Sequence, residues 1–462
     1  MSEPKPLPTP AARRLGLLAL GLATLLPMLG GSLANMVLPA LGQAFAVPFA
    51  SLQWVLVAYL LGITCLTVVA GRLGDRFGRR RLLLLGLGLF ALASLLCALA
   101  PTIGWLITAR ALQGVAAACM LSLALAMVGQ LVPPARRGWG MGLLGTLSAC
   151  GTALGPSFGG LLTAGFGWQA PFLLLVPLSL LALGCAWLGL PRDGSSPQQE
   201  GMNLASLSLL VAALLCYGLA LTLGGALALW WGAGALLVTA SFVRRERRAP
   251  VPLLPLALLG APGLGNGLVA SALVASVMVL TLLIGPFYLR GVFGLGLGTV
   301  GLMISGGPLL AALTGMPAGW LVDRLGARQV VRLGLAVMGA AALGLAGAAG
   351  QFGPLGYLLP ILLLTAGYAL FQTANNSAVV GGASEQTRGA VAGLLTLSRN
   401  LGQLTGVAGL GGLFAALVGE QGLTLASELV FGTRALFALS TLLIGLAFWL
   451  VGRRREGMLV SA

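Results

Sequence analysis

Long apolar runs, separated by short polar segments, fill the sequence from residue 14 to residue 451. About 20 apolar residues cross a bilayer as a helix, so each run of that length predicts one membrane span. Breaks at proline, glycine and charged residues separate the runs. They give fourteen predicted spans: 14–39, 51–71, 82–100, 105–131, 139–164, 168–190, 203–224, 227–243, 265–289, 297–321, 331–350, 355–381, 389–416 and 431–451.

The composition supports this all-α, multi-pass membrane fold. Hydrophobic residues make up 58% of the chain and charged residues only 8%, whereas a soluble domain carries about 25% charge. The low charge excludes an ordinary water-soluble enzyme. The length of the apolar runs excludes a transmembrane β-barrel, because barrel strands are short and alternate in polarity.

The net charge of +16 is distributed unevenly along the loops. If the spans alternate in direction, 22 of the 26 Lys and Arg residues lie on the side that carries both termini. The opposite side holds Arg290 and Arg434. The positive-inside rule therefore predicts that both termini are cytoplasmic, in a bacterial plasma membrane. The basic residues match anionic lipid headgroups, and we expect no nucleic-acid partner.

Few residues are available for chemistry inside the membrane. The sequence has no His, its six Cys lie singly in apolar runs, and no GxxxxGK[ST] motif for ATP binding occurs. None of the ten Asp and Glu residues falls clearly within a predicted span. We therefore expect no metal site, no cofactor and no enzymatic activity, and a monomeric protein.

Two segments of the sequence repeat each other. Residues 71–80 read GRLGDRFGRR and residues 319–328 read GWLVDRLGAR, which agree at six of ten positions. The two copies begin 248 residues apart. This distance is longer than six spans with their loops, by about the length of two further spans. This indicates two six-span halves with a two-span insert, and a substrate site between the halves. The expected parts are a tail (1–13), an N-terminal half (14–190), a linker with two extra spans (191–264), a C-terminal half (265–451) and a second tail (452–462).

The first repeat places a carboxylate among arginines. Gly71 and Gly78 are expected to permit tight turns. Asp75 is expected to be stabilised by Arg76, Arg80 and a helix N-terminus. Arg81 completes the basic run, and the second copy has Gln329 in its place, which predicts a weaker attachment there. The second copy supplies Gly319, Asp323, Arg324, Gly326 and Arg328.

This pattern resembles the signature loop of the major facilitator superfamily. Four further segments strengthen the resemblance, which covers nearly the whole chain. LITARALQG (106–114) is similar to the superfamily's span-4 motif, and GTALGPSFGG (151–160) to its span-5 antiporter motif. QWVLVAYLL (53–61) and NNSAVVGGASEQTRG (375–389) are similar to the fourteen-span drug:proton antiporter branch. The resemblance implies transport by alternating access, with the two repeated loops as latches that hold one access state.

The span-5 motif has a clear physical meaning. Gly151, Gly155 and Gly159 are spaced four apart and form one smooth stripe, on which another helix can pack closely. Pro156 removes a backbone donor and favours a kink, which Gly160 softens. The family associates this motif with exporters.

Polar residues inside the spans are candidates for a central cavity. Arg110 and Gln113 share a face of span 4, where a buried guanidinium needs a partner. The other candidates are Asn35, Trp54, Tyr59, Gln372, Asn375, Asn376, Arg399, Asn400 and Gln403. These groups either line the cavity or form hydrogen bonds that hold the bundle together.

One position departs from the family pattern. Gly30 stands where the fourteen-span relatives usually carry an Asp in span 1, so the usual proton carrier is absent. We expect a secondary active exporter of small amphipathic or drug-like compounds, with protons as the candidate coupling ion. The alternative is an uncoupled or differently coupled carrier of a neutral or anionic metabolite or lipid.

Overall fold

The computed structural model describes residues 10–133, 136–193, 204–223, 225–249, 252–253, 256–260, 263–383, 387–422 and 425–452. Helices make up nearly all of this part of the chain, and no β-strand occurs in it. The α-helices are α1 (Pro10–Phe45), α2 (Phe49–Phe77), α3 (Arg79–Ala98), α4 (Ile103–Leu131), α5 (Arg137–Phe166), α6 (Ala170–Gly189), α7 (Leu204–Thr222), α8 (Gly225–Glu246), α9 (Leu264–Phe293), α10 (Leu297–Leu325), α11 (Ala327–Ala348), α12 (Leu355–Gly381), α13 (Arg388–Leu404), α14 (Gly411–Gly422) and α15 (Ala426–Gly452). Two short segments complete the set: η2 (Leu256–Gly260), a 3₁₀-helix, and η3 (Thr405–Leu410), a π-helix.

The expected all-α membrane fold is confirmed. Each predicted span overlaps one helix, except that the span at 389–416 comprises α13, η3 and α14. Within the described residues, thirteen helices are long and apolar enough to cross a membrane. The remaining predicted span is α5, a 30-residue helix in which nine residues are glycine, so its hydropathy is low. The structure is thus consistent with fourteen spans. Most of the two expected tails, and residues 194–203 of the linker, lie outside the described residues.

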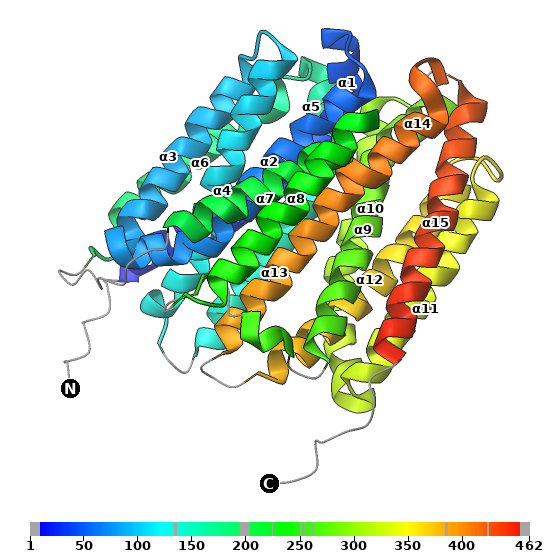
Figure 1. Cartoon of the computed structure of the whole chain (residues 1–462). Helices are drawn as coiled ribbons and strands as arrows, with labels where there is room; N and C mark the ends of the chain where they lie inside the picture. The colour runs from blue at the N-terminus through cyan, green and yellow to red at the C-terminus, as the bar shows by residue number, and fades with distance from the viewer. Residues whose placement is uncertain are drawn as a thin grey trace.

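The helices form two groups with a pair between them (Figure 1). Helices α1–α6 pack together on one side, and α9–α15 on the other. The inserted pair, α7 and α8, runs across the face where the groups meet. Helix α7 contacts α2 of the first group and η3 of the second, and α8 packs against α7. Helix α1 begins, and α15 ends, at the same end of the bundle.

The π-helical turn at η3 lies where α13 meets α9 and α7. A Cβ atom on Gly402 would overlap the carbonyl oxygen of Ala272, so α13 approaches the α9 backbone directly. The Thr405 hydroxyl, at the first position of η3, lies 2.6 Å from the hydroxyl of Tyr217 on α7. A π-helical turn inside a transmembrane helix often marks a functional position. Here it marks the contact between the insert and the second group of helices.

The two groups touch closely at one end of the bundle, which we call the sealed end. There a Cβ on Gly160 of α5 would overlap the carbonyl oxygen of Leu297 of α10. A Cβ on Gly301 of α10 would likewise overlap the carbonyl oxygen of Pro156. The hydroxyls of Ser157 and Ser305 are hydrogen bonded across the same contact, at 2.6 Å. The two backbones therefore pack against each other without intervening side chains.

Helix α2 makes a second contact across the sealed end. The Phe49 ring lies 5.1 Å from the ring of Phe287 and 5.9 Å from that of Phe414, centroid to centroid. The buried Gln53 side chain donates through Nε2 to the carbonyl oxygen of Val407, at 3.0 Å. Aromatic packing and a buried hydrogen bond thus hold α2 against the opposite group.

The groups separate toward the other end, which we call the motif end because both repeated sequences lie there. Gly142 precedes Gly160 by eighteen residues, and Gly319 follows Gly301 by the same number. Eighteen residues are five helical turns, so Gly142 lies on the same face of α5 as Gly160, and Gly319 on the same face of α10 as Gly301. Yet no heavy atom lies within 4 Å of a Cβ placed on Gly142 or Gly319. Helices α5 and α10 are therefore in direct contact at the sealed end and apart at the motif end.

We predict that Gly160→Val destabilises the sealed end, because its side chain would collide with the α10 backbone. Overpacking of this kind costs about 1–3 kcal/mol. Gly165→Val is the matched control, since Gly165 is on the same helix, is exposed, and has open space around it. Thermal unfolding of the detergent-solubilised protein should show a lower melting temperature for Gly160→Val alone. Equal melting temperatures for the two variants would mean that the contact carries no stability.

Candidate functional site

The first repeated sequence forms a single sharp joint between two helices. Helix α2 continues through Phe77 and α3 begins at Arg79, so only Gly78 lies between them. Gly78 has φ +97°, a conformation that disfavours side chains. The expectation of a turn at Gly71 is wrong, because Gly71 lies within α2, where nothing interrupts the helix.

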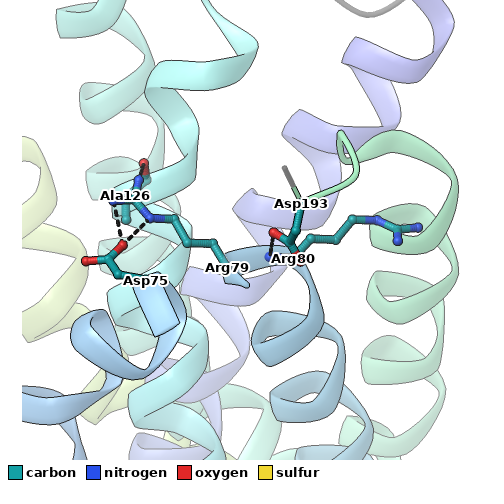
Figure 2. A network of polar contacts seen from close by, with 5 residues as sticks. All are labelled: Asp75, Arg79, Arg80, Ala126 and Asp193. Atoms are coloured by element: carbon teal, nitrogen blue, oxygen red, sulfur yellow. Dashed lines mark hydrogen bonds and ion pairs between the residues drawn. The ribbon is translucent and has the colours of Figure 1, made fainter. Parts of the chain in front are cut away.

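The carboxylate of Asp75 binds a different arginine from the two that we expected. Arg79 donates through Nε to Asp75 Oδ1 at 2.8 Å, and its Nη1 donates to the Ala126 carbonyl of α4 at 3.4 Å (Figure 2). Arg76 instead lies over the ring of Phe77, 5.4 Å from its centroid. The spacing of four residues between Asp75 and Arg79 is the sequence signal that identifies this pair.

Asp193 is the carboxylate that caps α3, a role the sequence analysis did not assign. Its two oxygens accept hydrogen bonds from the backbone N–H groups of Arg80 (2.9 Å) and Arg81 (3.0 Å). A Cβ on Gly78 would overlap the Asp193 carboxylate, so glycine is needed there for space as well as for its φ. The negative charge also opposes the positive end of the α3 dipole. The segment after α6 is thereby tied to the start of α3.

The neighbouring side chains of Arg79 and Arg80 point in opposite directions (Figure 2). While Arg79 reaches Asp75 and α4, Arg80 extends toward α6. There its Nη2 donates to the carbonyl oxygen of Trp187 at 2.6 Å, and its guanidinium lies 5.3 Å from the centroid of the Trp187 ring. The basic run thus links α2, α4, α3 and α6 at the motif end.

The second repeated sequence forms the same joint with different contacts. Gly326 has φ +82° and separates α10 from α11. The position equivalent to Arg79 is Ala327, so Asp323 lacks the partner that Asp75 has. Arg324 lies 4.1 Å from the centroid of the Trp320 ring, and Arg328 donates to the carbonyl oxygen of Gly452 at 3.2 Å. The sequence shows this difference at Ala327. It removes the partner of the carboxylate itself, whereas the difference at Gln329 changes only the basic run that follows.

The glycine stripe of α5 packs on α1. Cβ atoms on Gly151 and Gly155 would overlap the Leu25 carbonyl oxygen and the Ser32 side chain of α1, respectively. A Cβ on Gly159 would come within 3.0 Å of the carbonyl oxygen of Leu33. Gly160 and Pro156 face α10 instead, as described above. The motif therefore fixes α5 to its own group on one face and to the opposite group on another.

Arg110 lies fully buried inside the first group of helices. Its Nε donates to the Val55 carbonyl oxygen at 3.1 Å and its Nη1 to that of Gly30 at 3.2 Å. Nη1 also donates to Gln113 Oε1, and the guanidinium lies 4.3 Å from the centroid of the Tyr59 ring. Backbone and amide oxygens and an aromatic face surround this cation in place of a carboxylate.

A short chain of side chains continues from Arg110. Gln113 Nε2 donates to the hydroxyl of Ser94 on α3 at 2.8 Å, and the Tyr59 hydroxyl donates to the carbonyl oxygen of Pro27 at 2.7 Å. Ser94 was missed because a serine within an apolar run carries no distinctive signal. At position 30 a Cβ would lie 3.2 Å from Phe90 and 3.9 Å from Gln113 Nε2, so the position lies at the edge of this network.

The other candidate residues form a separate group or bind locally. Arg399 Nη2 donates to Asn376 Oδ1 at 3.3 Å, joining α13 to α12. The buried Asn375 donates to the Gly267 carbonyl oxygen of α9 at 3.1 Å, and Asn35 donates to Gly31 within its own helix at 3.2 Å. Half-buried positions are occupied by Trp54, Gln372, Asn400 and Gln403. In the described part of the chain, no hydrogen bond joins the Arg110 network to the Arg399–Asn376 pair.

Comparison with known proteins agrees with this architecture. The profile of the Major Facilitator Superfamily matches residues 20–407. The chain is 31% identical over 408 residues to the uncharacterized transporter YebQ of Escherichia coli, covering 86% of this chain and 89% of that protein. It is 27% identical to the riboflavin transporter RibZ of Clostridioides difficile, with 84% and 85% covered. It is 29% identical to the tetracenomycin C resistance and export protein of Streptomyces glaucescens, with 87% and 76% covered.

A solved structure shares the same fold. A bacterial homolog of the human lysosomal transporter Spinster, solved in an inward-facing and occupied conformation, superposes with a TM-score of 0.71. The two chains are 16% identical, and the match covers 97% of this chain and 98% of the other. The resemblance inferred from the repeated sequences is thus confirmed, and the fold extends over the full bundle.

We predict that Asp193→Ala loosens the first turn of α3. It removes both hydrogen bonds to the Arg80 and Arg81 amides, and loss of such a cap costs about 0.5–2 kcal/mol. Amide hydrogen exchange over residues 79–84 should accelerate in Asp193→Ala. In the adjacent control Arg192→Ala it should stay at the wild-type rate, because Arg192 is exposed. Unchanged exchange in Asp193→Ala would show that the carboxylate does not cap the helix.

Proposed function

Because the chain belongs to the Major Facilitator Superfamily, we propose that it is a secondary active exporter of small amphipathic compounds working by alternating access. The observation that carries the proposal is the position of the contacts between the two groups of helices. They are concentrated at the sealed end, through Gly160, Gly301 and Gln53, while α5 and α10 lie apart at the motif end. A bundle closed at one end only is one of the two states that alternating access requires.

The charge distribution supports an orientation for this state. Most of the basic loop residues belong to the motif end, which the positive-inside rule places in the cytoplasm together with both termini. The bundle would then be open to the cytoplasm, as an exporter must be when it takes up its substrate. We propose the bacterial plasma membrane as its location, and the divisions 14–190, 191–264 and 265–451 as its N-terminal half, linker with two extra helices, and C-terminal half.

The Asp75 joint is well placed to act as a latch in the other state. The carboxylate is 44% exposed, so it is available for a further contact. Helix α2 packs against α13, and α13 begins at Arg388, on the motif end. Closing the motif end would bring Asp75 toward the positively polarised N-terminus of α13. The Asp323 joint lacks the Arg79 equivalent and would contribute less.

The buried charges argue for a substrate without a permanent positive charge. Arg110 and Arg399 are cations within the helical bundle. Gly30 stands where the fourteen-span relatives usually carry an Asp, so that carboxylate is absent. A cation entering the bundle would lose hydration and, among the described residues, would find no carboxylate among the hydrogen-bond partners of either arginine. Export by one relative and riboflavin transport by another are compatible with uncharged or anionic amphiphiles.

The absence of an acid in span 1 also favours the second candidate. In it, the protein carries a neutral or anionic metabolite or lipid without proton coupling, or with a different ion. The antiporter-type stripe Gly151–Gly160 favours the exporter. Both candidates use the same bundle and differ in their response to a pH gradient.

We predict that proteoliposomes containing the protein transport neutral and anionic amphiphilic dyes faster than a dicationic dye, by about tenfold. The reason is the presence of Arg110 and Arg399 with no carboxylate among their hydrogen-bond partners in the described residues. Arg399→Ala should slow transport of the anionic dye more than that of the neutral one. Acceleration by an imposed pH gradient supports the proton-coupled exporter, and indifference to it supports the alternative. Preferred transport of the dicationic dye would contradict the proposed charge selectivity, and failure to move any of the three would contradict the exporter.

We predict that Asp75→Asn lowers the turnover of the reconstituted protein about tenfold, because it removes the charge that attracts the α13 N-terminus in the closed-motif state. Asp323→Asn is the matched control and should retain most of the activity, since Asp323 lacks the equivalent of Arg79. Protein amounts per vesicle are to be equalised. Similar activity of the two variants would mean that the Asp75 joint only connects α2 to α3.

A further inference from the structure

A groove of about 1030 Å³ runs between α3 and α6, on the outer face of the first group of helices. Its walls are almost entirely leucine, glycine and tryptophan, and one charged residue, Arg81, lies at its motif end. Leu85 and Leu188 on its rim are each 69% exposed, so the groove faces outward, away from the other helices. In a membrane, such a surface is covered by lipid.

Two glycines hollow the groove. Gly88 of α3 and Gly184 of α6 line it, and no heavy atom lies within 4 Å of a Cβ placed on either. Glycine in a helix interior is less favourable than alanine by about 1 kcal/mol, and tight helix packing is the usual compensation. Neither glycine has such a packing partner within the described chain. Their effect is to keep a space open on the surface of the bundle.

The guanidinium of Arg81 is available to a ligand. Within the described residues, Arg79 is bound to Asp75 and Arg80 to Trp187, whereas Arg81 is exposed and only its backbone N–H is engaged, by Asp193. Both Asp193 oxygens accept hydrogen bonds from the α3 amides, which spreads the carboxylate charge over the helix end. A phosphate needs a donor of this kind at the level of the headgroups.

The dimensions of the groove match one leaflet. From Arg81 to Leu92, the far end of the lining on α3, the helix rises about 16 Å. This is about half of the ~30 Å hydrocarbon thickness, which is the depth reached by a single acyl chain. The exposed Trp187 ring lies beside Arg81 at the motif end, where aromatic side chains mark the membrane interface.

We propose that this groove is a binding site for one anionic phospholipid of the leaflet at the motif end. An acyl chain lies along the groove between Gly88 and Gly184, and the headgroup phosphate binds the Arg81 guanidinium. The site adjoins the Gly78 joint, so the bound lipid touches the same helix start that Asp193 caps. The proposal depends on the geometry of α3 and α6, and it stands whether or not the protein exports amphiphiles.

Native mass spectrometry of the full-length protein, with titrated phosphatidylglycerol or phosphatidylethanolamine, tests the site. Wild type should bind one phosphatidylglycerol more tightly than phosphatidylethanolamine. Arg81→Gln should lower that affinity about fivefold, the worth of one interfacial arginine toward an anionic surface. Gly88→Leu and Gly184→Leu should each lower the affinity for both lipids about tenfold, because the side chain fills the space of the acyl chain.

Two variants serve as controls. Arg248→Gln removes an exposed arginine beyond the end of α8, and Gly445→Leu fills an open position in the middle of α15, away from the groove. Both should retain the wild-type affinity. Should either groove glycine variant fail to fold, the other glycine variant and Arg81→Gln still decide the matter.

Three results would overturn the proposal. Equal phosphatidylglycerol binding by wild type, Arg81→Gln and the glycine variants would place the bound lipid elsewhere. A dimer that dissociates on Gly88→Leu would identify a second copy as the occupant of the groove. Displacement of the lipid by an amphiphilic dye, with loss of dye transport in Gly88→Leu, would assign the groove to substrate.

Discussion

The direct packing of helix α5 against backbone on two sides is the interaction on which the rest of the bundle depends. One stripe of α5 lies on α1, through Gly151, Gly155 and Gly159, while Gly160 and Pro156 lie on α10. Helices without a hydrophobic driving force between them associate through close van der Waals packing, which small residues permit. Because α5 belongs to one group and touches the other, it fixes where the two groups meet and where they diverge.

The polar interior follows from a different constraint. A buried guanidinium requires partners, and Arg110 obtains them from the carbonyl oxygens of Val55 and Gly30, from Gln113 and from the Tyr59 ring. None of these partners is an anion, so the site keeps a net positive charge in a region of low dielectric. Arg399 has an amide partner, Asn376, and no carboxylate partner in the described part of the chain. This electrostatic asymmetry distinguishes the interior from one that would favour cations.

Much of this architecture was predictable because it rests on local patterns. Hydrophobic run length predicted spans that each overlap a helix of the structure, and the six matching positions around Asp75 and Asp323 predicted two repeated halves. The family motifs located the glycine stripe. Features that join distant segments were not predictable in the same way. The cap formed by Asp193 on Arg80 spans 113 residues, and nothing in the sequence around Asp193 distinguishes it from an exposed loop acid. The hydrogen bond between Gln53 and Val407 is a similar case.

Local patterns left the position of one turn and the local geometry of one span undetermined. Gly71 was expected to turn the chain, but a glycine flanked by helix-favouring residues remains helical, and the left-handed turn occurs at Gly78. The predicted span at 389–416 is present, and within it the structure adds a π-helical turn from Thr405 that contacts α7 and α9. Such a turn adds one residue to a helical repeat and leaves no compositional trace.

The inserted helix α7 imposes a mechanical condition on any motion of the bundle. Its Gly218 lies on Leu61 of α2, and the adjacent Tyr217 is hydrogen bonded to Thr405 on the other group. One turn of α7 therefore contacts both groups of helices at once. In the alternating-access cycle proposed above, α2 and η3 part at the sealed end, and α7 would then have to move with one group of helices and slide over the other. Such a motion would stretch the Tyr217–Thr405 hydrogen bond on one side of α7 or shift the Gly218–Leu61 contact on the other.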